Sequence, residues 1–171
     1  NYTALSTATS ALSASSGVDS YCSAIGSAGE AAAQSAVKIV WQDAVNAMQK
    51  TESHAVGPIA NNDDTLRNRI HSYANVDLGE CSIDRAVVAQ TDANFDLSAR
   101  SSNQRGLGAI EYLLFNTTLT TSCAPQITET SSWDALSSAD KKTQRCTYAS
   151  KLATDVASAA SSVLTSWQAS G

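Results

Sequence analysis

The chain has 171 residues, of which 43% are hydrophobic and 6% aromatic, and its formal net charge is −5. This length predicts one domain, or two at most. The acidic charge argues against nucleic acid as a partner, and no apolar run approaches the length of a membrane-spanning helix. Small residues dominate, with 29 Ala, 26 Ser and 16 Thr, whereas 8 Gly and 2 Pro are too few for collagen-like or Pro/Gly-rich disordered protein. We therefore expect closely packed helices.

The four cysteines predict an exported protein. None lies in a C-x-x-C pair, so zinc-ribbon and thioredoxin-like sites are not favoured. An even number, together with many Ser and Thr, favours two disulfides over four separate buried thiols. Three pairings are possible; we expect Cys123 with Cys146, which flank one loop segment, and therefore Cys22 with Cys81. The first residues lack a positively charged start and an apolar block, so no signal peptide is expected in this sequence.

Three long segments carry apolar residues at spacings of three or four. This period predicts helices over residues 2–25, 30–51 and 138–169. The middle one has the clearest stripe, with its charged residues elsewhere on the helix. No strand alternation of useful length and no internal repeat is present.

Shorter elements lie between the second and third long helices. Residues 64–73, 81–90 and 107–115 predict short helices, and residues 75–81 and 116–132 predict loops. The resulting expectation is an all-α fold in a single domain. It is an up-down bundle of the four-helix type with a short-helix insertion between the second and third long helices.

No common catalytic motif is present. The sequence has no H-E-x-x-H pair, no G-x-S-x-G turn, no P-loop and no dinucleotide-binding fingerprint. A metal or acid–base site would therefore use scattered side chains. The candidates are Glu52, His54, Asp63, Asp64, His71, Asp77, Glu80, Asp84 and Glu111.

Glu111 is the most informative of these residues, because it stands inside the apolar segment RGLGAIEYLLF. A carboxylate in such a segment is either buried and paired or lines a cleft. The pairing alternative would use Arg67, Arg69 or Arg105. The sequence leaves both alternatives open.

The segment GLGAIEYLLFN, residues 106–116, resembles the signature G-x-H-x-x-E-Y-L-L-F of the imelysin-like family. The resemblance extends over nearly the whole chain, because further blocks follow in the family's order. These are Trp41 with Glu52 and Gly57-Pro58, residues 66–88, and Trp133 with Cys146 and Tyr148.

The resemblance implies an all-helical bacterial protein of the cell envelope or periplasm, often a lipoprotein. Its family is linked to iron uptake and was first described as metallopeptidases that cleave insulin. It also implies two helical bundles with a site between them, of which residues 1–171 correspond to the N-terminal one. The partners implied are the second bundle, from the same protein or another chain, and iron-uptake components. Membrane contact is expected only through a lipid anchor outside this sequence.

One departure from the signature affects the metal binding that the signature implies. The family's His falls on Gly108, whereas Gly106, Glu111 and Tyr112 match, as do Trp41 and Glu52 more loosely. His and Glu three residues apart lie on one face of a helix, which suits binding of one metal ion. Without the His, a single carboxylate is a poor site for a transition metal.

The first hypothesis is therefore a non-catalytic binding or accessory module of iron uptake. Iron or another divalent metal is its candidate cofactor, with Glu111, Glu52 and His54 as candidate ligands. The second is a metallopeptidase in which these residues or His71 hold the metal. The third is a structural or interaction domain in which Glu111 is a satisfied carboxylate.

Overall fold

The computed structural model describes residues 1–53, 55–72 and 78–170, and every regular element within them is helical, which confirms the all-α prediction. The α-helices are α1 (Tyr2–Ser13), α2 (Val18–Ala24), α3 (Glu30–Glu52), α4 (Asn61–His71), α5 (Glu80–Ala89), α6 (Gly106–Phe115) and α7 (Ser138–Ser170). Short 3-10 helices lie at Gly57–Ile59 (η1), Ser102–Gln104 (η2), Thr128–Thr130 (η3) and Trp133–Ala135 (η4).

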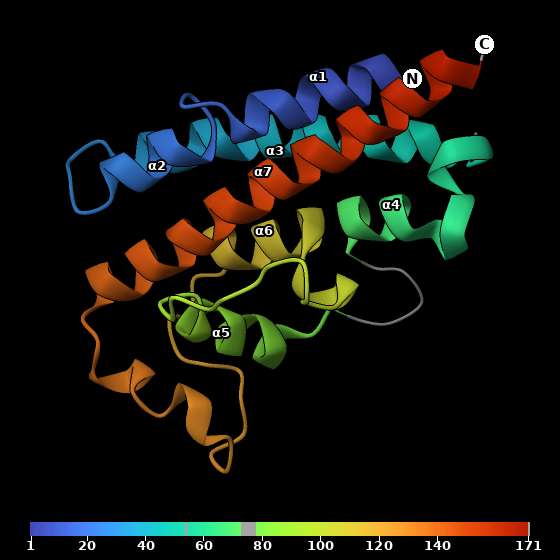
Figure 1. Ribbon diagram of the computed structural model, residues 1–171. Helices are drawn as coiled ribbons and strands as arrows, with labels where there is room; N and C mark the ends of the chain where they lie inside the picture. The colour runs from blue at the N-terminus through green and yellow to red at the C-terminus, as the bar shows by residue number, and fades with distance from the viewer. Residues whose placement is uncertain (54, 73–77, 171) are drawn as a thin grey trace.

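Four helices close a ring of neighbours. α1 packs on α3, α3 on α6, α6 on α7, and α7 on α1. Figure 1 shows α1 and α2 following one another along α3, which runs in the opposite direction, with α6 and α4 on the other side of α7. The arrangement is that of a four-helix bundle whose fourth helix, α6, comes from the insertion between the long helices.

The single helix predicted over residues 2–25 is wrong, because the chain leaves the helical path after Ser13 and resumes it at Val18. Ala14 is extended, and a Cβ at Gly17 would collide with the carbonyl oxygen of Leu12. The intervening Ser-Ser-Gly run has weak helix propensity, since serine side chains compete for backbone hydrogen bonds. The spacing of the apolar residues continues across this break, so the sequence pattern does not reveal it.

The other elements follow the prediction closely. α3, α6 and α7 match their expected ranges to within a residue, and α4 begins three residues earlier than expected, at Asn61. The predicted loop over residues 75–81 lies partly outside the described residues. So do the candidate residues His54 and Asp77 and the side chains of Asp63 and Asp64.

The bundle core is apolar and rich in alanine. Its larger fully buried side chains include Leu5 and Leu12 of α1, Met48 of α3, Ile110 of α6, and Leu152, Val156 and Val163 of α7. Alanines at positions 44, 149, 159 and 160 are also fully buried. The alanine excess therefore lies partly in the helix contacts, as expected. None of the described helices is long and apolar enough to cross a membrane.

All four cysteines form disulfides, but not in the pairing expected. Cys22 of α2 is bonded to Cys146 of α7, and Cys81 of α5 is bonded to Cys123 in the loop after α6. The expected pairs, Cys123 with Cys146 and Cys22 with Cys81, are wrong because α2 packs against α7 while the loop folds back over α5. Proximity along the chain did not decide the partners.

Candidate functional site

The segment 106–116 forms helix α6 and its C-cap, and Gly106 allows that helix to start against the end of α4. Its φ is +80°, a left-handed value that favours glycine. A Cβ at this position would lie 2.7 Å from the carbonyl oxygen of Ile70 and 2.9 Å from that of Arg69. The glycine of the signature is therefore required by backbone packing.

Ser72 caps α6 from a distance in the chain. Its hydroxyl donates to the carbonyl oxygen of Arg105 and accepts the backbone N–H groups of Gly108 at 3.0 Å and Ala109 at 3.4 Å. These are N–H groups in the first turn of α6, which have no partner within the helix. The sequence offered no signal for this cap, because Ser72 lies more than 30 residues upstream.

A buried carboxylate joins α4, α6 and α7. Asp155 of α7, with 8% of its side chain exposed, accepts hydrogen bonds from Arg69 at 2.7 Å and from Arg105 at 2.8 Å. Two guanidinium groups around one carboxylate make charge-assisted bonds, which are stronger than neutral ones. The start of α6 is thereby tied to the end of α4 and to the middle of α7.

Glu52 is also engaged in an ion pair. Its carboxylate oxygens accept two hydrogen bonds from Nε of Arg67, at 2.9 and 3.0 Å, and one from Nη2, at 2.8 Å. His54, the second proposed ligand, lies outside the described residues. Among the described residues, no three His, Cys, Asp or Glu side chains gather in a way that could hold a metal ion.

Glu111 lies on the exposed side of α6, and none of the three candidate arginines pairs with it. Those arginines bind Glu52 or Asp155 instead. No hydrogen bond or ion pair joins the Glu111 carboxylate to any described residue. Of the two alternatives left open by the sequence, the structure shows the second, because Glu111 lines a cleft.

The cleft consists of two cavities that share Gly108 and Glu111. The first, here called the α3–α6 cavity, has a volume of about 220 Å³, and Trp41, Met48, His71 and Leu107 are among its lining residues. The second, the α5–α6 cavity, has a volume of about 340 Å³, and Glu80, Tyr112 and Phe115 are among its lining residues. The position where the signature has His therefore lies at the junction of both.

Two aromatic residues of the signature blocks have defined partners. The indole N–H of Trp41 donates to the carbonyl oxygen of Leu107 at 2.9 Å, and its ring meets that of Phe115 edge-on at 5.6 Å. The Tyr112 hydroxyl donates to Asp84 at 3.0 Å. Burial, above all, raises the pKa of Tyr112 to about 12, so the phenol keeps its proton at neutral pH. Both residues position α6.

Asp84, a candidate acid–base residue, serves a structural network instead. It is 2% exposed and accepts hydrogen bonds from the backbone N–H and the hydroxyl of Ser122 at 2.7 and 3.0 Å. Arg145, 1% exposed, lies 3.5 Å from the other carboxylate oxygen and donates to the Thr118 carbonyl at 2.8 Å. The buried pair fastens the loop after α6 to α5 and α7.

His71 is another candidate that lines the cleft. It is half-buried at the end of α4, and desolvation lowers the pKa of its imidazole below 6.5. At neutral pH the ring is therefore uncharged. Of the sequence candidates, the structure brings His71 and Glu111 to the α3–α6 cavity and Glu80 and Glu111 to the α5–α6 cavity.

Comparison with known proteins supports the resemblance of the signature. The model of the peptidase family described as Imelysin matches residues 1–171. A search of curated proteins and a search of solved structures each returned no match.

Proposed function

The chain belongs to the imelysin family, and from that premise we propose that it is an exported protein of the cell envelope that serves iron uptake as a binding or accessory module. Two disulfides support export, because such bonds persist in oxidising compartments. The observation that supports binding over catalysis is the donor set around Glu111. Among the described residues it contains no group of three His, Cys, Asp or Glu side chains, and at the position of the family's His it has no side chain at all.

The residues present do not fit the metal ion that the family resemblance implies. Gly108 supplies no ligand, and Glu52 already binds Arg67 through both carboxylate oxygens. Transition metals are held by several N, O or S donors in a defined geometry. His71 shares the α3–α6 cavity with Glu111 and Glu80 shares the α5–α6 cavity, but no three such groups gather among the described residues. Iron or another divalent metal at Glu111 would therefore need further donors, from His54 or from a second chain.

We further propose that the exposed side of α6 is covered by a second helical bundle, from the same protein or from another chain. The support for this proposal is the position of Glu111, which stands unpaired between two cavities at the surface of the bundle. Iron-uptake components are the other partners proposed. Contact with a membrane would depend on a lipid anchor outside residues 1–171.

Titration calorimetry with Fe²⁺, Fe³⁺ and Zn²⁺ tests the binding chemistry in the full-length protein. We expect Gly108→His, which restores the family's pair, to bind at least one of these ions about tenfold more tightly than the natural chain, a difference of about 1.4 kcal/mol. Glu129→Gln, which removes an exposed carboxylate paired with Arg85, is the matched control and should change nothing. Circular dichroism checks that each variant is folded.

The alternatives give different results. Tight metal binding by the natural chain that is lost in both Glu111→Gln and His54→Asn, together with cleavage of insulin, would establish the metallopeptidase instead. For the iron-uptake role, the gene is deleted in its host and growth is compared under iron limitation. If growth is unaffected and the full-length protein binds no ligand through Glu111, the structural-domain alternative replaces the proposal.

A further inference from the structure

The α3–α6 cavity combines an apolar wall with a single acidic group. Met48 is fully buried and Leu107 is 3% exposed, while the Trp41 ring is half-buried at the same cavity. The volume of about 220 Å³ lies below the range of about 300–1,000 Å³ that is usual for drug-sized ligands. A ligand enclosed here is therefore small and largely apolar.

The charge of the cavity is negative. Among the described residues that line it, Glu111 is the only acidic side chain, and none is a lysine or an arginine. Burial lowers the pKa of His71, so its ring is neutral at neutral pH, and Glu52 and Arg67, which shift that pKa in opposite directions, form an ion pair with each other. A bound anion would meet an uncompensated carboxylate, whereas a cation would neutralise it.

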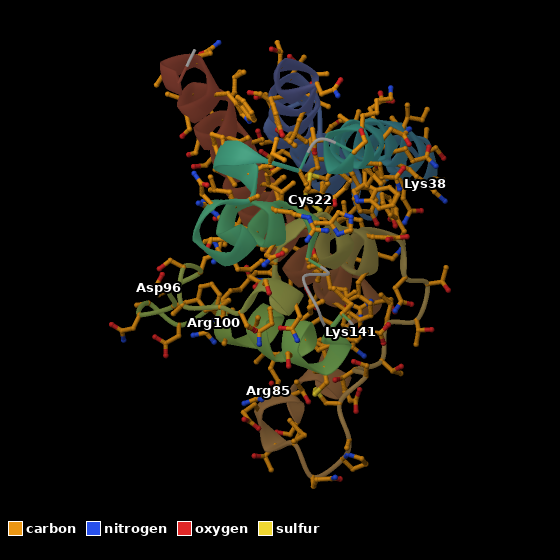
Figure 2. All side chains as sticks on the ribbon, turned by 90° about the vertical axis from the view of Figure 1, so that its right-hand side faces the viewer. Cys22, Lys38, Arg85, Asp96, Arg100 and Lys141 are labelled. Atoms are coloured by element: carbon orange, nitrogen blue, oxygen red, sulfur yellow. A yellow bond between two sulfur atoms is a disulfide. The ribbon has the colours of Figure 1, made fainter. Side chains whose placement is uncertain are left out.

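The arrangement of the aromatic rings also favours binding of a cation in the α3–α6 cavity rather than in the α5–α6 cavity. Trp41 is the aromatic residue type that attracts cations best, and its hydrogen bond to Leu107 fixes the ring at the cavity wall. In the α5–α6 cavity, the ring of Phe115 already has the Lys38 ammonium 5.8 Å from its centroid. Figure 2 shows Lys38 on the α3 side of the molecule. A second cation would find that ring already occupied, although two carboxylates, Glu80 and Glu111, line the α5–α6 cavity.

Gly108 determines how much room the ligand has. It is buried and lines both cavities, so any side chain at this position would take volume from the cleft. The missing His therefore has two consequences, since it removes a metal donor and leaves space beside Glu111. The same substitution that weakens a metal site favours an organic ligand.

Resting on the proposed function, we propose that the α3–α6 cavity binds a small organic monocation. Its protonated amine or quaternary ammonium group meets the Glu111 carboxylate, and its apolar part lies against Trp41 and Met48.

The test uses benzylammonium as the probe and nuclear magnetic resonance of the labelled tryptophan indole groups as the readout. The signal of Trp41, assigned from its loss in Trp41→Phe, should shift on titration, while those of Trp133 and Trp167 stay in place. Benzyl alcohol and benzoate have the same ring without the positive charge, and we expect each to bind at least tenfold more weakly. Tetramethylammonium reports whether the charged group alone suffices.

Two variants locate the site. Glu111→Gln keeps the shape of the side chain but removes its charge, and should weaken benzylammonium binding at least tenfold. Val45→Phe fills the cavity and should weaken it comparably. Glu129→Gln, beside Arg85 at the lower end of the molecule in Figure 2, is the control and should leave binding unchanged.

Three results would overturn the proposal: no binding of either ammonium probe, equal affinity for benzyl alcohol, or unchanged affinity in a folded Glu111→Gln variant. The outcome is separable from that of the proposed function. If the protein supports growth under iron limitation but does not bind ammonium ions, the proposed function stands and the ligand proposal is refuted. If the protein binds benzylammonium through Glu111 but its loss does not affect growth, the ligand proposal stands and the iron-uptake role is refuted.

Discussion

Replacing Gly106 by alanine tests whether backbone packing explains the first glycine of the signature. The φ of +80° costs an L-residue about 1–2 kcal/mol. The new Cβ would also lie 2.7 and 2.9 Å from the carbonyl oxygens of Ile70 and Arg69. It would lie 2.5 Å from the Ser72 hydroxyl oxygen, which caps α6 through bonds to Arg105 and Gly108. Displacing that hydroxyl removes two hydrogen bonds worth about 0.5–1.5 kcal/mol each. Gly106→Ala should therefore lower the free energy of unfolding by about 2–5 kcal/mol.

Urea unfolding followed by far-UV circular dichroism measures this change. Gly26→Ala is the matched control, because Gly26 has nearly the same φ, +79°, but a Cβ there meets nothing within 4 Å. It isolates the backbone cost of about 1–2 kcal/mol. The double variant with Ser72→Ala measures the part of the cost that comes from displacing the cap, since it should cost less than the sum of the single changes.

The reasoning is refuted if Gly106→Ala costs no more than Gly26→Ala. Additive effects of Gly106→Ala and Ser72→Ala would likewise show that the serine cap is not the group displaced.

Three further predictions concern stability. Asp155→Asn should cost about 3–5 kcal/mol in urea unfolding, because it leaves two partly buried arginines without their carboxylate; a loss below about 1 kcal/mol would class the network as an ordinary surface pair. Replacing both cysteines of a disulfide by serine should cost up to about 5 kcal/mol for the α2–α7 bond and about 4 for the α5–loop bond, since the sequence separations are 124 and 42 residues; the reverse order would contradict the chain-entropy explanation. The lowered pKa of His71 means that the unfolded chain binds its proton more readily. The contribution of His71 is therefore complete above its unfolded pKa of about 6.5 and is lost as the pH falls below that value. The melting temperature should drop between about pH 7.5 and 5.5 in the natural chain and in His54→Asn, but less in His71→Asn.

Local patterns made most of the secondary structure predictable. The apolar periods of α3, α6 and α7 placed these helices to within a residue, because a helix brings side chains three and four positions apart onto one face. The composition pointed to disulfides, and the segment around Glu111 carried the family signature. The break after Ser13 was missed, since the period of the apolar residues continues across it.

The candidate site was only partly predictable. Glu111 stood out because a carboxylate is costly in an apolar segment. The residues around it could not be predicted, because Trp41 and His71 come from helices that are distant along the chain. The ion-pair partners of the arginines could not be predicted from the sequence either. Several carboxylates were available to each, and packing brought Asp155 rather than Glu111 to Arg69 and Arg105.

Composition and charge by themselves determined a small-residue-rich, acidic chain, the spacing of its apolar residues determined that it is helical, and the signature determined its family. Only the tertiary structure decided which cysteines pair, that Ser72 caps α6 and that Glu111 remains unpaired between two cavities. The physical reason is the range of the interactions. Helix formation depends on neighbours within one turn, whereas disulfides, remote caps and cavities depend on which helices pack together, and that is settled by the whole core at once.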